Sequence, residues 1–133
     1  MIDASLERLI DYDGRRYWLS NGWCIRFSVK RIEAEAGRPF GIKYALTLHD
    51  AGMVRLMGFD NAHWIPRQIE FDHFHRFGRL RPPVPYRFVD ADSLLVDFFM
   101  AVERACEDED VPFRFSRDDI EFEPEDEGDE ETR

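Results

Sequence analysis

The segment YWLSNGWCIRFSVKRI, residues 17–32, decides the fold class of this chain. Asn21-Gly22 separates two runs that are rich in aromatic and β-branched residues. This is the strongest local signal for a hairpin, because both turn residues tolerate positive φ. After the turn every second side chain is apolar, which gives the strand one hydrophobic face made of Trp23, Ile25, Phe27 and Val29. The sequence therefore predicts an antiparallel sheet that contains this hairpin.

The same alternation continues downstream. Residues 33–39 break it and predict a connecting loop, and then FGIKYALTLHD, residues 40–50, predicts a third strand. Its apolar side chains share one face: Ile42, Tyr44, Leu46 and Leu48. Lys43 and Thr47 lie on the other face. The turn Asp50-Ala51-Gly52 leads into a fourth strand, MVRLMGF. We expect an antiparallel meander with one face that needs cover.

A C-terminal helix is expected to supply that cover. Residues 91–110, ADSLLVDFFMAVERACEDED, repeat apolar side chains at helical spacing, and Asp90 or Asp92 would cap the start. A short N-terminal helix would begin at a capping Asp3. We predict an α+β fold, in which a C-terminal helix covers one face of a meander of four to six strands. Three prolines, Pro82, Pro83 and Pro85, predict irregular chain before a short run, YRFV, at residues 86–89.

The length and the charge distribution indicate one domain and a tail. A chain of 133 residues builds a single core, which we place in residues 1–117. Residues 118–133 hold ten acidic residues and one arginine, a balance of −9, which leaves −1 of the net charge of −10 for the rest. Residues 15–88 hold 13 Lys plus Arg and 6 Asp plus Glu, a balance of +7. We expect a basic body and an acidic, disordered tail, although genomic base composition explains the arginine excess equally well.

The sequence also indicates a cytoplasmic location and no cofactor. No apolar run approaches the roughly 18 residues of a membrane span, and the N-terminus is too acidic for a secretion signal. Cys24 and Cys106 lie far apart, so they match neither a zinc ribbon nor a C-x-x-C redox motif.

Candidate functional residues gather in FDNAHWIPRQIEFDHFHRFGRLR, residues 59–81, which contains three of the four histidines. Asp60, Asn61 and His63 fall where the fourth strand should end, and strand ends present side chains to a ligand. If residues 72–76 are extended, His73 and His75 point to one face.

These residue types suit metal-independent RNA cleavage, in which the 2′-OH of the substrate is the nucleophile. Acid–base chemistry would come from His63, His73, His75 and Asp60, and Asn61 would contact the substrate. A cation would stabilise the phosphorus oxygens, and the candidates are Arg67, Arg76 and Arg79. We therefore predict that the three imidazoles lie in one patch beside at least one of these arginines.

Three other interpretations stay open. His63 with the H-x-H pair could supply three nitrogen ligands to a metal. The histidines could instead pack on aromatic rings, and Asp60-Asn61 could cap a turn. The chain could also be a non-enzymatic binding module whose basic face docks nucleic acid or an acidic protein.

The order NGW-x-IRF, GIKYALTLHD, FDNAH-x-x-P and FDHFH resembles the TumE family of small toxins from prokaryotic toxin–antitoxin modules. The resemblance covers residues 17–99. The matched positions are Asp60, Asn61, Ala62, His63, Pro66, His73 and His75. It implies the toxin half of a type II module, neutralised by a cognate helix-turn-helix antitoxin, and it brings no established catalytic set. RNA is a further expected partner, and a homodimer stays open.

Overall fold

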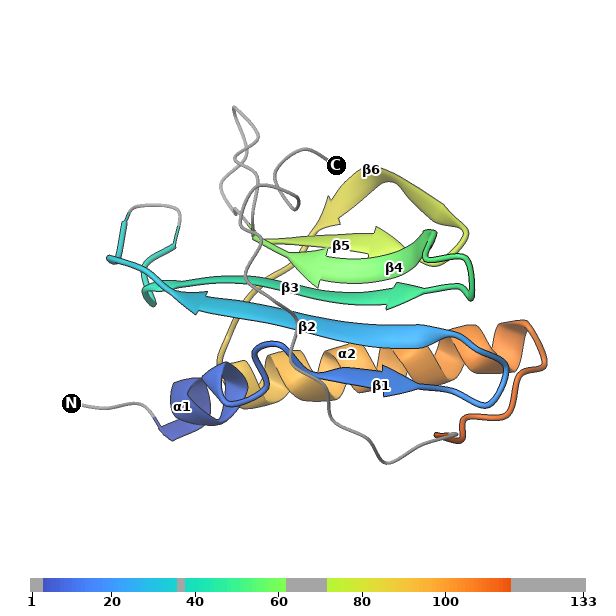
Figure 1. The fold of residues 1–133 in the computed structure, drawn as a ribbon. Coiled ribbons are helices and arrows are strands. Elements are labelled where there is room, and N and C mark those ends of the chain that lie inside the picture. The colour runs from blue at the N-terminus through green and yellow to red at the C-terminus, as the bar shows by residue number, and fades with distance from the viewer. Residues whose placement is uncertain (1–3, 36–37, 62–71, 116–133) are drawn as a thin grey trace.

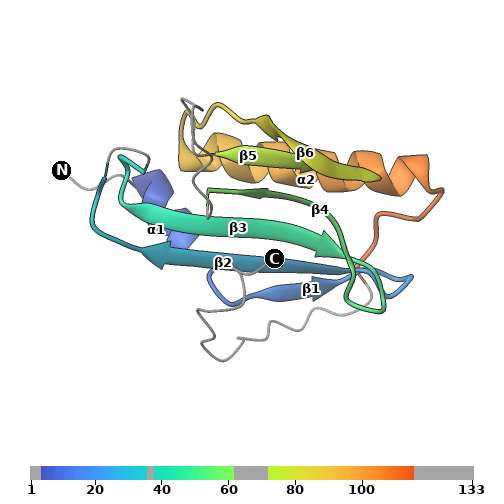
Figure 2. The same cartoon turned by 90° about the horizontal axis from the view of Figure 1, so that it is seen from above.

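The computed structural model describes residues 4–35, 38–61 and 72–115. Within them the elements follow in the order α1 (Ala4–Ile10), β1 (Arg16–Trp18), β2 (Cys24–Arg31), β3 (Ile42–His49), β4 (Arg55–Asp60), β5 (His73–Arg76), β6 (Arg79–Pro85) and α2 (Ala91–Asp108). Each strand pairs antiparallel with the next, so the sheet order is β1-β2-β3-β4-β5-β6. Both views show α2 running alongside the strands (Figures 1 and 2). The predicted α+β meander is confirmed.

The predicted turn at Asn21-Gly22 joins β1 to β2. The Gly22 amide donates to the Leu19 carbonyl at 3.0 Å, and Gly22 has a φ of +92°, which is unfavourable for residues with a side chain. The Asn21 side-chain oxygen accepts from the Trp23 amide at 3.1 Å. Asn21 therefore stabilises the turn through its side chain, while Gly22 supplies the backbone conformation.

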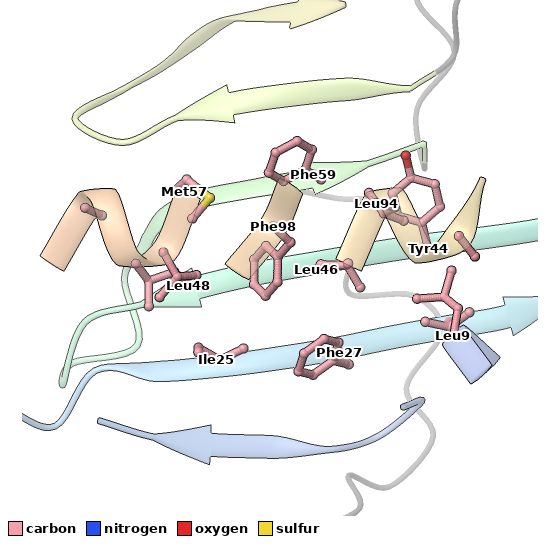
Figure 3. Close-up of a cluster of buried hydrophobic side chains, with 14 of the residues drawn as sticks. Leu9, Ile25, Phe27, Tyr44, Leu46, Leu48, Met57, Phe59, Leu94 and Phe98 are labelled. Atoms are coloured by element: carbon pink, nitrogen blue, oxygen red, sulfur yellow. The ribbon is translucent and has the colours of Figure 1, made fainter. Parts of the chain in front are cut away.

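The core lies between the sheet and α2, as Figure 3 shows. Phe27 on β2 pairs with Leu46 on β3, which pairs in turn with Phe59 on β4. Phe98 of α2 packs against this row, with ring centroids 5.6 Å from Phe27 and 6.2 Å from Phe59. The alternating apolar positions predicted on the strands all face this core or pack at its margin.

Both ends of α2 have defined caps. The Asp90 side chain accepts from the Ser93 amide at 2.7 Å, which confirms Asp90 as one of the two predicted caps. At the other end Asp110 has a φ of +57°, and the Val111 amide donates to the Cys106 carbonyl at 2.8 Å. This is the pattern that closes a helix through one left-handed residue.

The expectation of irregular chain at the prolines was wrong. β6 contains Pro82, Pro83 and Pro85, whereas residues 86–89 form no strand. Proline lacks the amide N–H that a central strand needs, but β6 is the last strand of the sheet and pairs on one side alone. The prolines therefore fit an edge that resists pairing with another chain.

Two further expectations, the capping Asp3 and the tail at residues 118–133, lie outside the described residues. In the part of the chain that the structure describes, no helix is long and apolar enough to cross a membrane.

Candidate functional site

The sheet face opposite α2 is polar. Because neighbouring strands are in register, the side chains between the core positions line up in rows across this face, and one row runs from Arg26 through Thr47 and Gly58 to His75. We call this surface the polar face. Its members are Arg16, Trp18, Arg26, Lys30, Lys43, Thr47, His49, Arg55, Asp60, His73 and His75. Five of these are Arg or Lys and one is acidic, so the face carries a cationic balance.

Two basic side chains of the polar face lie close to the same carboxylate oxygen, Oδ2 of Asp60. Arg55 Nη2 donates to Asp60 Oδ2 at 2.9 Å, and His75 Nε2 lies 3.1 Å from the same Oδ2. We call Arg55, Asp60 and His75 the Asp60 cluster. The Asp60 side chain is 5% exposed, so this carboxylate is held between two basic groups with little contact to water.

Both ring nitrogens of His75 face hydrogen-bond acceptors. Its Nδ1 lies 3.1 Å from the Leu80 carbonyl, and its Nε2 faces the Asp60 carboxylate. Carbonyl and carboxylate oxygens only accept hydrogen bonds, so both contacts are satisfied when each ring nitrogen carries a proton. The ring links Asp60 at the end of β4 to Leu80 of β6.

The Asp60 carboxyl is ionised over the physiological pH range. Burial raises its pKa, but hydrogen bonds from His75 and Arg55, together with their charges, lower it more. The pKa falls from its ordinary 3.8 to about 2. Asp60 is therefore a fixed negative charge that holds the two basic side chains in place.

Asn61 is bound to the backbone of β3. Its side-chain Oδ1 accepts from the Tyr44 amide at 2.9 Å, and its Nδ2 donates to the Ile42 carbonyl at 3.0 Å. The Asn61 carbonyl accepts from Arg38 Nε at 2.7 Å. Asn61 thus continues the pairing of β3 through its side chain, and it fixes the chain directly after Asp60.

The start of β5 is fixed by contacts on both sides of the sheet. His73 pairs in register with Asp60, and it is 1% exposed. The preceding Asp72 accepts from the Tyr44 hydroxyl at 2.6 Å, and burial of this phenol raises the pKa of Tyr44. These contacts hold β5 against β4, where His75 faces Asp60.

The structure brings some of the predicted residues together and separates others. Asp60, His73 and His75 share the polar face, and for the two histidines the alternation predicted this. Arg76 follows Phe74 on the opposite side of the β5 pleat, and Arg79 pairs with Arg76 across the hairpin. His63 and Arg67 lie outside the described residues, so the predicted patch of three imidazoles stays a prediction.

No group of three or more His, Cys, Asp or Glu side chains that could hold a metal lies among the described residues. The three-histidine metal site considered from the sequence includes His63, which this part of the structure does not cover.

Sequence reasoning missed Arg55 and His49. His49 Nε2 lies 2.8 Å from the Thr47 hydroxyl, and the same alternation that placed Lys43 and Thr47 on one face continues to His49. No alternation in the sequence placed Arg55 on this face. One extra residue in β4, where the register shifts between Leu48 and His49, turns Arg55 toward the polar face.

A family model described as Toxin TumE matches residues 24–105, which is more than half of the chain. The chain belongs to the TumE toxin family. The match extends from the start of β2 into α2, so it includes the sheet strands that carry the Asp60 cluster. Neither the curated proteins nor the solved structures contain a match to this chain.

Proposed function

We propose that this TumE-family toxin acts on RNA, with the polar face as the substrate surface and the Asp60 cluster as the centre of the chemistry. One observation carries the proposal. The face opposite α2 gathers His73, His75 and Asp60 among five Arg and Lys side chains. Cations on a surface attract the phosphate backbone, and imidazoles exchange protons near neutral pH.

The reaction would be an internal displacement at phosphorus. A general base takes the proton of the 2′-OH, O2′ forms a bond to phosphorus, and the P–O5′ bond breaks as the 5′ oxygen receives a proton from a general acid. The products are a 2′,3′-cyclic phosphate and a 5′-OH end. His75 supplies the acid, since both of its ring nitrogens lie within hydrogen-bond distance of acceptor oxygens. His63 or His73 supplies the base.

Asp60 and Asn61 would hold this arrangement. The Asp60 carboxylate orients both Arg55 and His75, and the Asn61 amide keeps the end of β4 attached to β3. Because the Nε2 proton of His75 points at Asp60, donation to RNA requires the substrate to compete with that carboxylate.

The second candidate function is a binding module without catalysis. It is favoured because the polar side chains of the site are already hydrogen-bonded or buried. Both nitrogens of His75 face acceptors, the Asn61 amide pairs with backbone, and His73 is 1% exposed. In this case the polar face docks RNA or an acidic protein. In either case we propose that a helix-turn-helix antitoxin neutralises the toxin in the cytoplasm.

A cleavage assay separates the two candidates. The protein is incubated with a single-stranded RNA, with and without chelator, and with the same strand carrying one 2′-deoxy residue at the cleaved position. The proposal expects a cyclic phosphate product, no effect of chelator, and no product at the deoxy position. RNA that is bound but stays intact would favour the binding module, and loss of activity with chelator and its return with zinc would favour a metal site.

A further inference from the structure

We propose that Arg55 is the residue through which the polar face binds an RNA phosphate. This inference rests on the function proposed above, and it assigns the cation that sequence reasoning placed elsewhere. The Arg55 guanidinium contacts the Asp60 cluster directly, whereas Arg76 lies on the opposite side of β5 and Arg79 pairs with Arg76.

An unused donor on Arg55 points to a ligand. Within the described part of the chain, three guanidinium Nε atoms are buried without a hydrogen-bond partner, in Arg15, Arg55 and Arg76. Arg15 lies over the Tyr12 ring, 4.6 Å from its centroid, and Arg76 is on the helix side of β5. Arg55 is thus the one of the three on the polar face. A buried polar group without a partner is uncommon and calls for an explanation.

The geometry of a guanidinium explains why the Nε of Arg55 has no partner among the described residues. The Nε–H and one Nη2–H point the same way and form a fork that matches two oxygens of a carboxylate or phosphate. Asp60 Oδ2 accepts from Nη2, and nothing described accepts from Nε. Asp60 therefore engages one arm of the guanidinium and leaves a donor for an oxygen that arrives from outside.

The local charge permits an anion here in spite of Asp60. The Arg55 guanidinium offsets the charge of the Asp60 carboxylate, and His75 faces the same carboxylate oxygen. In the same face, Lys43 of β3 and Arg26 of β2 add further cations. The Arg55 side chain is 23% exposed while its Nε is buried, so an anion that binds Nε has to shift the groups that cover this atom.

The test follows the Arg55 side chain by NMR in the unaltered full-length protein, labelled with ¹⁵N. A buried Nε–H without a protein partner gives a resolved resonance, and we titrate it with inorganic phosphate and with a short single-stranded RNA. We expect the Arg55 Nε resonance to shift with both ligands. A shift with inorganic phosphate alone, or no shift with either, would overturn the assignment.

A conservative variant adds a binding readout. Arg55→Lys keeps the positive charge beside Asp60 but loses the fork, so we expect RNA affinity to fall about tenfold. Arg104→Lys, at an exposed arginine of α2 on the other side of the sheet, should leave the affinity unchanged. Equal loss in both variants would show that the guanidinium at position 55 has no special part in binding and would overturn the proposal. If Arg55→Lys fails to fold, the resonance of the unaltered protein decides.

These readouts also separate this inference from the proposed function. RNA that shifts the Arg55 resonance but is never cleaved would reject catalysis and keep Arg55 as the phosphate contact. RNA that is cleaved with full efficiency by Arg55→Lys would keep the function and reject Arg55.

Discussion

Arg55 reaches Asp60 by passing over Gly58. Arg55 Nη2 is 2.9 Å from Asp60 Oδ2, and a Cβ added at Gly58 would lie 2.6 Å from that same Nη2. It would also lie 3.0 Å from the Leu46 carbonyl oxygen and 3.0 Å from Thr47 Cγ2. The missing side chain at Gly58 is therefore what allows this ion pair to form on a continuous strand.

Gly58→Ala should destabilise the fold and displace Arg55. The new methyl group meets backbone as well as the guanidinium, so the strand cannot relieve the contact by a rotamer change alone. We expect the free energy of unfolding to fall by about 1–3 kcal/mol, measured by urea denaturation. The matched control is Gly52→Ala in the exposed β3–β4 turn, where the added Cβ would lie 3.5 Å from Asp50 Oδ1, an ordinary van der Waals distance. Similar losses in the two variants would contradict this account.

Asp60→Asn should cost stability in a pH-dependent way. The folded-state pKa of Asp60, about 2, is below its ordinary 3.8, so the carboxylate stabilises the fold above pH 3.8 and loses that effect as the pH falls toward 2. The shift corresponds to about 2 kcal/mol at pH 7. Urea denaturation of both proteins between pH 7 and pH 3 should show the difference shrinking at the acid end. A difference that stays constant would mean that the carboxylate charge has no part in it.

The outline of the fold was predictable because its signals are local. The Asn21-Gly22 turn and the alternation in β2 and β3 depend on a few neighbouring residues. The site was predictable in part for the same reason, since His73 and His75 are two residues apart on one strand. The pairing of Arg55 with Asp60 was not predictable, because it requires a register shift in β4 and a glycine between the two residues. The strand at Pro82 was missed because a proline is tolerated only when the strand is at an edge, which is a property of the whole sheet.

His75→Gln separates catalysis from folding better than an alanine variant. The amide of glutamine can still donate to Asp60, so the buried carboxylate keeps two partners, but glutamine cannot transfer a proton. If His75 is the general acid, we expect RNA cleavage to fall by about 10²–10⁴-fold. Toxicity on induced expression should fall with it, while the urea midpoint changes little. Full toxicity in a folded His75→Gln protein would remove His75 from the chemistry.

His73→Ala should reduce stability, in contrast to the expectation for an exposed histidine. His73 is 1% exposed and lies opposite Asp60 in the β4–β5 register, so truncation removes a buried side chain and leaves a cavity. We expect the free energy of unfolding to fall by about 1–3 kcal/mol. Activity measurements on this variant are therefore interpretable only at a temperature where thermal denaturation shows it folded. A loss below about 0.5 kcal/mol would indicate that the site tolerates truncation.

Removal of residues 118–133 should strengthen RNA binding at low salt. These residues carry ten acids and one arginine, and they follow Phe115, which pairs with Leu19 next to β1 and its Arg16. Tethered there, the segment has a local concentration on the order of millimolar near the cations of the polar face, so it competes with RNA phosphates. Salt screens both interactions, and the gain in affinity from the deletion should shrink between about 50 mM and 200 mM salt. Equal affinity of the full-length and shortened proteins for a short single-stranded RNA at about 50 mM salt would show that the acidic residues do not compete, and that they serve only to keep the protein soluble.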